Sequence, residues 1–254
     1  MLAPRIPRMA RALVLACVAC ASGTAGAATA SVCYGTSSHG RLQDGVQLPA
    51  TGNNFVAYSV LGTQMGRTWV HGSVAQVMLA AWQQLETTAP GITYVYGETG
   101  HRAGGPMPPH RTHEAGIAVD FMVPVRDASG QPVRLPATAL NKYGYAWEFD
   151  GAGKAGGLTI DYEALGEHLF QLDRAGKRMH TPVARIIFDP RLMPALFNTR
   201  HGPALQALPF MRGKPWIRHD EHYHVDSAYR AAHLMAERHR TGPAQIVLVT
   251  TACT

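Results

Sequence analysis

Residues 116–123 constrain the fold of this chain most strongly, because they form an apolar run that only Asp120 interrupts. An apolar run of this kind belongs in the protein interior. A lone carboxylate buried there without a partner costs several kcal/mol, on the order of 2–7 kcal/mol even for a neutral polar group. A bound cation is one way to pair Asp120. The fold is therefore expected to bring cation ligands to this aspartate.

A second stretch, residues 214–226, contains several candidate ligands. His222 and His224 are two positions apart, a spacing that directs both side chains to one face of a strand. The flanking residues favour an extended segment, namely Trp216, Ile217, Tyr223 and Val225. A His-x-His pair alone also occurs on solvated strand faces, so the pattern carries weight only together with Asp120.

His113 lies just before the apolar run, where a loop could direct its ring towards Asp120. Two imidazoles and one carboxylate, with a fourth position left to water, make the ligand set of a catalytic zinc site. The alternative is a set of solvated histidines, since the chain contains 13 of them.

These motifs resemble a known group of enzymes. His113-x-x-Gly116-x-Ala118-x-Asp120 followed by His222-x-His224 is similar to the metal signature of lysostaphin-type peptidases, D-Ala-D-Ala metallopeptidases and hedgehog domains. The chain resembles the penicillin-insensitive murein endopeptidases more closely. The likeness runs from about Gly45 to Val225 and includes Leu48-Pro49, Arg67-Thr68-Trp69-Val70-His71, Gly104-Gly105-Pro106, His110-x-x-His113, Arg185-Ile186-Ile187-Phe188, Pro215-Trp216 and His219-Asp220-x-His222-x-His224.

With this resemblance, we expect His113, Asp120 and His224 to bind zinc and water to take the fourth position. His222 shares a strand face with His224 and is the favoured general base. Glu221 is the alternative base, because it stands where the D-Ala-D-Ala dipeptidases carry a glutamate. In a regular strand the side chain of Glu221 would point to the face opposite His222 and His224, whereas a β-bulge would bring it to the same face.

Three further residues receive expected roles. The resemblance implies that His219 stabilises the oxyanion or protonates the leaving amine, provided that the strand begins after it. Arg102 is a candidate substrate-binding residue, as a basic residue at this place is in related peptidases, or a solvated loop arginine. His110 is expected to orient a ligand or to belong to a second metal site, so one zinc ion or two are anticipated.

The resemblance implies a peptidoglycan D,D-endopeptidase that cuts D-alanyl–diaminopimelate cross-links in the periplasm. One alternative is a D,D-dipeptidase or carboxypeptidase, which the position of Glu221 favours. The other is a non-catalytic, zinc-stabilised domain that binds the cell wall. The net charge gives little further information on the substrate. The first 27 residues, an expected leader that is removed, contain three arginines and no acids. The formal net charge therefore falls from +6 to +3, with 20 Lys and Arg against 17 Asp and Glu. This balance is no nucleic-acid footprint.

The first 27 residues have the pattern of a secretory signal peptide, with a basic front, an apolar run and a small-residue cleavage site at residues 25–27. The apolar run is too short to span a bilayer. A lipoprotein anchored through Cys17 is the less favoured alternative. Cys33 and Cys253 would remain in the mature chain and are expected to form a disulfide in an oxidising compartment, with separate thiols as the alternative.

Residues 28–254 are expected to form one zinc-peptidase domain of the α+β class, with helices around a small antiparallel sheet. The clearest helix carries an apolar stripe from Val74 to Leu85. Residues 34–72 are expected to be mostly irregular, 143–160 a hairpin, 227–240 a helix and 245–251 a final strand. No repeat or linker divides the chain.

Overall fold

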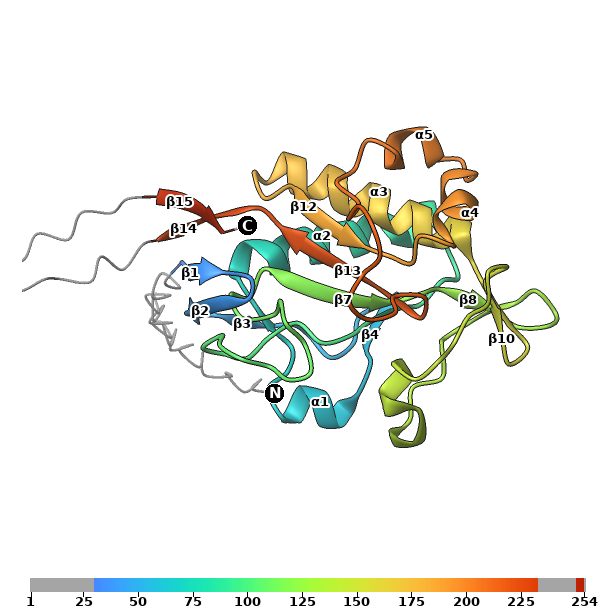
Figure 1. The fold of residues 1–254 in the computed structure, drawn as a ribbon, viewed down its shortest axis with the longest axis horizontal. Coiled ribbons are helices and arrows are strands. Elements are labelled where there is room, and N and C mark those ends of the chain that lie inside the picture. Colours follow the sequence, from blue (N-terminus) through green and yellow to red (C-terminus); the bar gives the residue numbers. More distant parts are fainter. Residues whose placement is uncertain (1–29, 233–249, 254) are drawn as a thin grey trace, which may run out of the picture.

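The computed structural model describes residues 30–232 and 250–253, and it is organised around a five-stranded sheet (Figure 1). The strand order is β12-β13-β7-β6-β4. The strands are β4 (Phe55–Ala57), β6 (Tyr94–Tyr96), β7 (Ala118–Met122), β12 (Val183–Ile187) and β13 (His222–Ser227). Neighbouring strands are antiparallel except for β4 and β6, which are parallel. The predicted α+β class is confirmed, and the sheet has one parallel pair at its edge.

Two long helices cover one face of this sheet, α2 (Gly72–Thr88) and α3 (Tyr162–Arg178) (Figure 1). The predicted apolar stripe of α2 is buried, including Met78 and Trp82. On α3, His168 hydrogen-bonds through Nδ1 to the hydroxyl of Tyr223 in β13. Because side chains alternate along a strand, Tyr223 faces the helices while His222 and His224 point to the other face.

Smaller elements surround this core. The shorter helices in the described part of the chain are α1 (Val60–Gln64), the 3-10 helix η1 (Ala139–Gly144), α4 (Met193–Phe197) and α5 (Gly202–Leu205). A four-stranded sheet contains β8 (Val125–Arg126), β9 (Pro132–Val133), β10 (Lys154–Ala155) and β11 (Leu158–Ile160). Three two-stranded sheets pair β1 (Val32–Thr36) with β2 (His39–Gln43), β3 (Val46–Gln47) with β5 (Trp69–Val70), and β14 (Tyr229–Ala232) with β15 (Thr250–Cys253).

Several sequence expectations were wrong. The segment 34–72 is not mostly irregular, since it contains β1 to β5 and α1. Residues 143–149 contain the end of η1 in place of a strand, and only the hairpin of β10 and β11 forms. The start of the expected helix 227–240 is strand β14, which pairs with β15 and so satisfies its backbone groups between strands.

Some expectations fall outside the described residues: the leader 1–27 with Cys17, residues 233–240, and residues 245–249 of the final strand. Among the helices that the structure describes, none combines the length and the apolar character needed to cross a bilayer.

Candidate metal centre

The register of the central sheet brings the two histidine-rich stretches together. Strands β7 and β13 pair with Asp120 directly opposite His224 and Met122 opposite His222. Side chains that are directly opposite, or two apart on one strand, point to the same face. Asp120, His222 and His224 therefore share the face opposite α2 and α3. All three are buried, with exposed fractions of 1%, 4% and 2%.

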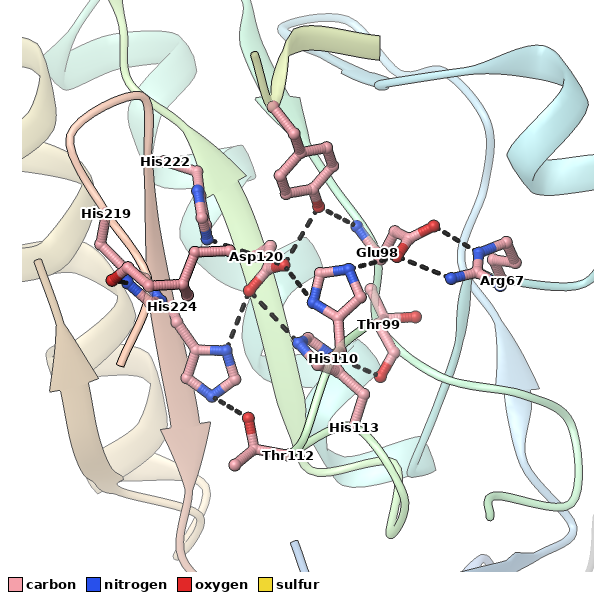
Figure 2. A network of polar contacts seen from close by, with 12 residues as sticks. Arg67, Glu98, Thr99, His110, Thr112, His113, Asp120, His219, His222 and His224 are labelled. Atoms are coloured by element: carbon pink, nitrogen blue, oxygen red, sulfur yellow. Dashed lines mark hydrogen bonds and ion pairs between the residues drawn. The ribbon is translucent and has the colours of Figure 1, made fainter. Parts of the chain in front are cut away.

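Four imidazoles converge on the carboxylate of Asp120 (Figure 2). Its Oδ1 lies 2.9 Å from Nδ1 of His224 and 3.3 Å from Nε2 of His113. Its Oδ2 lies 3.5 Å from Nδ1 of His110 and 4.0 Å from Nε2 of His222. The ligating atoms of His110, His113 and Asp120 lie within 4.8 Å of one another, a grouping that could hold a metal ion. His224 reaches the same carboxylate from the other side.

The ring nitrogens that face away from Asp120 are held by oxygen acceptors. Nδ1 of His113 lies 3.1 Å from the backbone oxygen of Thr99, and Nε2 of His224 lies 3.0 Å from Oδ1 of Asp226. In the neutral rings these contacts favour a proton on the outer nitrogen and a lone pair on the nitrogen that faces Asp120. Nε2 of His113 is buried and makes no hydrogen bond to any described residue. Two such lone pairs beside one carboxylate fit a divalent cation.

His110 is fixed by a buried carboxylate that the sequence analysis did not single out. Its Nε2 lies 2.5 Å from Oε2 of Glu98, and Glu98 also accepts hydrogen bonds from Arg67 (Figure 2). The hydroxyl of Tyr58 donates a further hydrogen bond to Glu98. Burial opposes the ionisation of Glu98, but its hydrogen bonds with His110 and Arg67 outweigh it and lower the pKa to about 2. Glu98 lies two residues after the end of β6, so an acid just beyond a buried strand was the available signal.

Tyr145 fixes the second oxygen of Asp120. Its hydroxyl donates to Oδ2 of Asp120 over 3.0 Å and accepts the backbone N–H of Glu98 over 2.9 Å. The chain reaches this position through a turn in which Lys142 and Tyr143 have positive φ angles of 51° and 56°. Such a turn has no clear signature in non-glycine residues. The expected strand over this segment is therefore wrong, and Tyr145 could not be recognised as a site residue from the sequence.

His222 and Glu221 form a pair beside Asp120. Strand β13 begins at His222, so Glu221 precedes it and is not held to the opposite face. Nδ1 of His222 lies 2.8 Å from Oε1 of Glu221, and Oε2 of this glutamate has no partner among the described residues. His219 also precedes the strand, as its expected role required. Its ring centroid lies 4.6 Å from that of His222, and its Nδ1 lies 2.9 Å from the backbone oxygen of Ile217.

The charges in this cluster depend on one another. Burial would raise the pKa of Asp120, but the imidazoles of His113 and His222 outweigh it and hold that pKa well below its ordinary value. Burial lowers the pKa of His113, which keeps this ring neutral and able to bind a metal. For His224, burial is outweighed by the carboxylates of Asp226 and Asp120, which raise its pKa to about 9. The metal-free ring therefore carries a second proton near neutral pH, and a metal bound at Nδ1 would have to displace it.

Glu221 and His219 have pKa values shifted in opposite directions. The pKa of Glu221 is raised by burial. The pKa of His219 is lowered to about 3, first by burial and then by the nearby His222.

Arg102 is the predicted site residue that the structure does not connect to the cluster. It is exposed, and its guanidinium carbon lies 5.4 Å from the ring centroid of Trp69. Among the described residues, no hydrogen bond or ion pair joins Arg102 to the histidines. Arg67, which holds Glu98, is the arginine that the structure places beside them.

Comparison with known families agrees with this geometry. The family of penicillin-insensitive murein endopeptidases matches residues 33–237, which is most of the chain. The chain belongs to this family. It is therefore a peptide hydrolase that acts on murein, and its site can be interpreted as that of a murein endopeptidase. A comparison with curated proteins gave no match. The family match spans His110, His113, Asp120, His222 and His224.

Proposed function

We propose that this murein endopeptidase is zinc-dependent and cuts D-alanyl–diaminopimelate cross-links between peptidoglycan stem peptides. The observation that carries the proposal is the pair of outer acceptors, Thr99 and Asp226, which direct one nitrogen each of His113 and His224 at Asp120. Two neutral imidazoles and a carboxylate are the donor set of hydrolytic zinc enzymes. The family match supports the substrate class, and the D,D bond is the finer part of the proposal.

His113, Asp120 and His224 would hold the zinc ion, and we expect one ion in each chain. When bound there, zinc would polarise the scissile carbonyl and lower the pKa of water to around 7. His110 orients Asp120 from the opposite side, because its two nitrogens lie between the carboxylates of Glu98 and Asp120. Arg67 offsets the charge of Glu98, so the second carboxylate does not itself need a metal.

His222 is the proposed general base. The carboxylate of Glu221 accepts a hydrogen bond from Nδ1–H of His222, so Nε2 is the nitrogen that takes the proton of the attacking water. Glu221 acts through His222 in this arrangement and positions it. The carboxylates of Asp120 and Glu221 outweigh burial and raise the pKa of His222, which suits a group that must accept a proton.

His219 is proposed to stabilise the oxyanion or to protonate the leaving amine. Its Nδ1–H donates to the backbone carbonyl of Ile217, so Nε2 of the neutral ring is an acceptor. Both roles therefore require the protonated ring. Because burial lowers the pKa of this ring to about 3, either role depends on the negative charge that develops beside it in the transition state.

The test of substrate and metal is incubation of the purified protein with cross-linked and linear muropeptides, with and without a chelator, followed by mass spectrometry. Cleavage of the cross-linked dimers that the chelator abolishes supports the proposal. Release of terminal D-alanine from linear muropeptides, without cleavage of dimers, would instead identify a carboxypeptidase. Zinc binding without any hydrolysis would point to a wall-binding domain.

Residue roles are tested with single variants. His113→Ala, Asp120→Ala and His224→Ala should each lose zinc and activity, whereas His222→Ala should keep zinc and lose turnover. An exposed histidine of β2 gives the matched control, His39→Ala, which should change neither property. If Glu221→Gln abolishes turnover while His222→Ala remains active, the assignment of the base is wrong.

The proposal also includes a periplasmic location, a cleaved leader and a disulfide between Cys33 and Cys253. Cys33 is buried in β1, and Tyr229 of β14 packs against the small cluster that contains it. Cys253 lies opposite Tyr229 in the register of β14 and β15, and β15 lies beside β1 (Figure 1). This neighbourhood supports a bond between Cys33 and Cys253. The mass of the alkylated mature protein with and without reductant tests both the bond and the cleavage site.

A further inference from the structure

A large groove lies beside α4 and the segment that follows α5, and none of the clustered histidines lines it. Its volume is about 1660 Å³, and it is lined by α4, by the segment 206–218 and by the residues that precede β10. Its apolar lining includes Phe197 and Phe210, whose rings meet edge to face with centroids 5.3 Å apart. A groove of this size can hold several residues of an extended peptide.

Two cations in the groove are not neutralised by any acid of the described residues. Three of its arginines are paired with carboxylates: Arg185 with Asp226, Arg191 with Asp189, and Arg218 with both Glu148 and Asp220. Arg212 and Lys214 also line the groove and are exposed, but neither makes an ion pair or hydrogen bond with another described residue. The groove therefore presents two uncompensated positive charges next to an apolar surface.

One segment of the chain both lines the groove and leads to the proposed active site. Ile217 and Arg218 line it and come directly before His219 in the chain. Phe149, which also lines the groove, is tied to the same segment, because its backbone N–H donates to Oδ2 of Asp220 over 2.6 Å. Ile217 is 53% exposed, an apolar side chain left in solvent at the point where the groove approaches the histidines.

We propose that this groove binds one stem peptide of the cross-linked substrate, next to the bond that is cut. The free carboxylates of that peptide would lie at Arg212 and Lys214, and its aliphatic parts would lie on Phe210 and Ile217. This inference rests on the proposed function for the identity of the substrate. A cross-link joins two peptide strands, so an enzyme that cuts it must accommodate chain on each side of the scissile bond.

The test compares the double variant Arg212→Gln/Lys214→Gln with a control that removes the same charge elsewhere, Arg134→Gln/Lys154→Gln. All four side chains are exposed, so folding should be unaffected, and thermal unfolding verifies this. For muropeptide dimers, we expect KM of the groove variant to rise about three- to tenfold with kcat unchanged, since solvent-exposed charge contacts are individually weak. The control should retain the KM of the unmodified enzyme.

A modified substrate separates charge recognition from other effects. When the free carboxylates of the dimer are converted to amides, the unmodified enzyme and the groove variant should have the same KM. A difference that persists with the amidated dimer would overturn the assignment of these cations to substrate carboxylates.

Binding without turnover distinguishes this inference from the proposed function. In a His222→Ala background, the dissociation constant for the dimer should rise with the groove substitutions and not with the control pair. If the groove substitutions and the control pair give equal dissociation constants for the dimer, the groove inference is overturned, even if the unmodified enzyme cleaves dimers normally. Absence of cleavage by the unmodified enzyme overturns the proposed function, while weaker dimer binding by the groove variant would still support the groove.

Discussion

Replacement of Asp226 by asparagine is expected to weaken zinc binding without removing any proposed ligand. Oδ1 of Asp226 lies 3.0 Å from Nε2 of His224, and Oδ2 accepts from Nε of Arg185 over 2.6 Å. An asparagine can offer an oxygen to only one of these partners. The cationic Arg185 would take it, so the amide NH2 would turn towards His224. That contact favours a proton on Nδ1 of His224, the nitrogen that faces Asp120.

The size of the effect follows from the role of such outer partners, whose loss typically weakens metal binding by about 10- to 100-fold. This corresponds to about 1.4–2.8 kcal/mol of binding free energy. Competition with a chromophoric chelator measures the dissociation constant directly. Asp189→Asn is the matched control, since it removes a carboxylate paired with Arg191, and Asp189 has no contact with a proposed ligand among the described residues.

The outcome is decisive in both directions. A zinc affinity of Asp226→Asn within twofold of that of Asp189→Asn would refute the reasoning, because His224 would then need no acceptor to expose Nδ1. Urea unfolding of the metal-free proteins verifies that both variants are folded.

Three further predictions concern Asp120, pH and the core. Tyr145→Phe removes the donor to Oδ2 of Asp120 and should weaken zinc binding by up to about tenfold. The hydroxyl of Tyr143 makes no hydrogen bond to a described residue, so the control Tyr143→Phe should leave zinc binding unchanged. Equal zinc affinities of the two variants would contradict the positioning role of Tyr145. Burial lowers the pKa of His168 to about 3 in the folded protein, below its unfolded value near 6.5. Between these two pH values the unfolded state binds a proton that the folded state does not. The free energy of unfolding should therefore fall as the pH decreases from about 6.5 to about 3, by up to about 1.4 kcal/mol per pH unit. His168→Gln should reduce that slope in urea unfolding at pH 4–6, and an unchanged slope would show that His168 does not titrate on unfolding. Leu165→Ala empties a fully buried position on α3 and should lower the free energy of unfolding by about 2–5 kcal/mol; a loss below about 1 kcal/mol would contradict its place in the core.

The sequence indicated which side chains meet at Asp120, because the relevant signals are local. A carboxylate in an apolar run and histidines two positions apart each define a strand face, so Asp120, His222 and His224 could be expected to meet once their strands paired. Asp226 continues the same period of two beyond His224 and could have been recognised from it.

The other residues around the site depend on tertiary structure. Tyr145 reaches Asp120 only because the chain turns back through positive φ angles, and Glu98 meets His110 only because a long loop returns to the sheet. The segment 34–72 was predicted to be irregular because its strands are two to five residues long and lack an apolar alternation. Strand β14 was predicted to be helical because its pairing with β15, which follows residues 233–249, leaves no signal in its own short sequence.

X-ray absorption at the zinc edge tests the central claim most directly. Protein reconstituted with zinc should show an ion bound by imidazole nitrogens at about 2.0–2.1 Å together with oxygen ligands, and Asp120→Ala and His224→Ala should each lose this signal while His39→Ala retains it. Zinc that fails to bind, or an imidazole signal that survives both substitutions, would contradict the proposed metal centre.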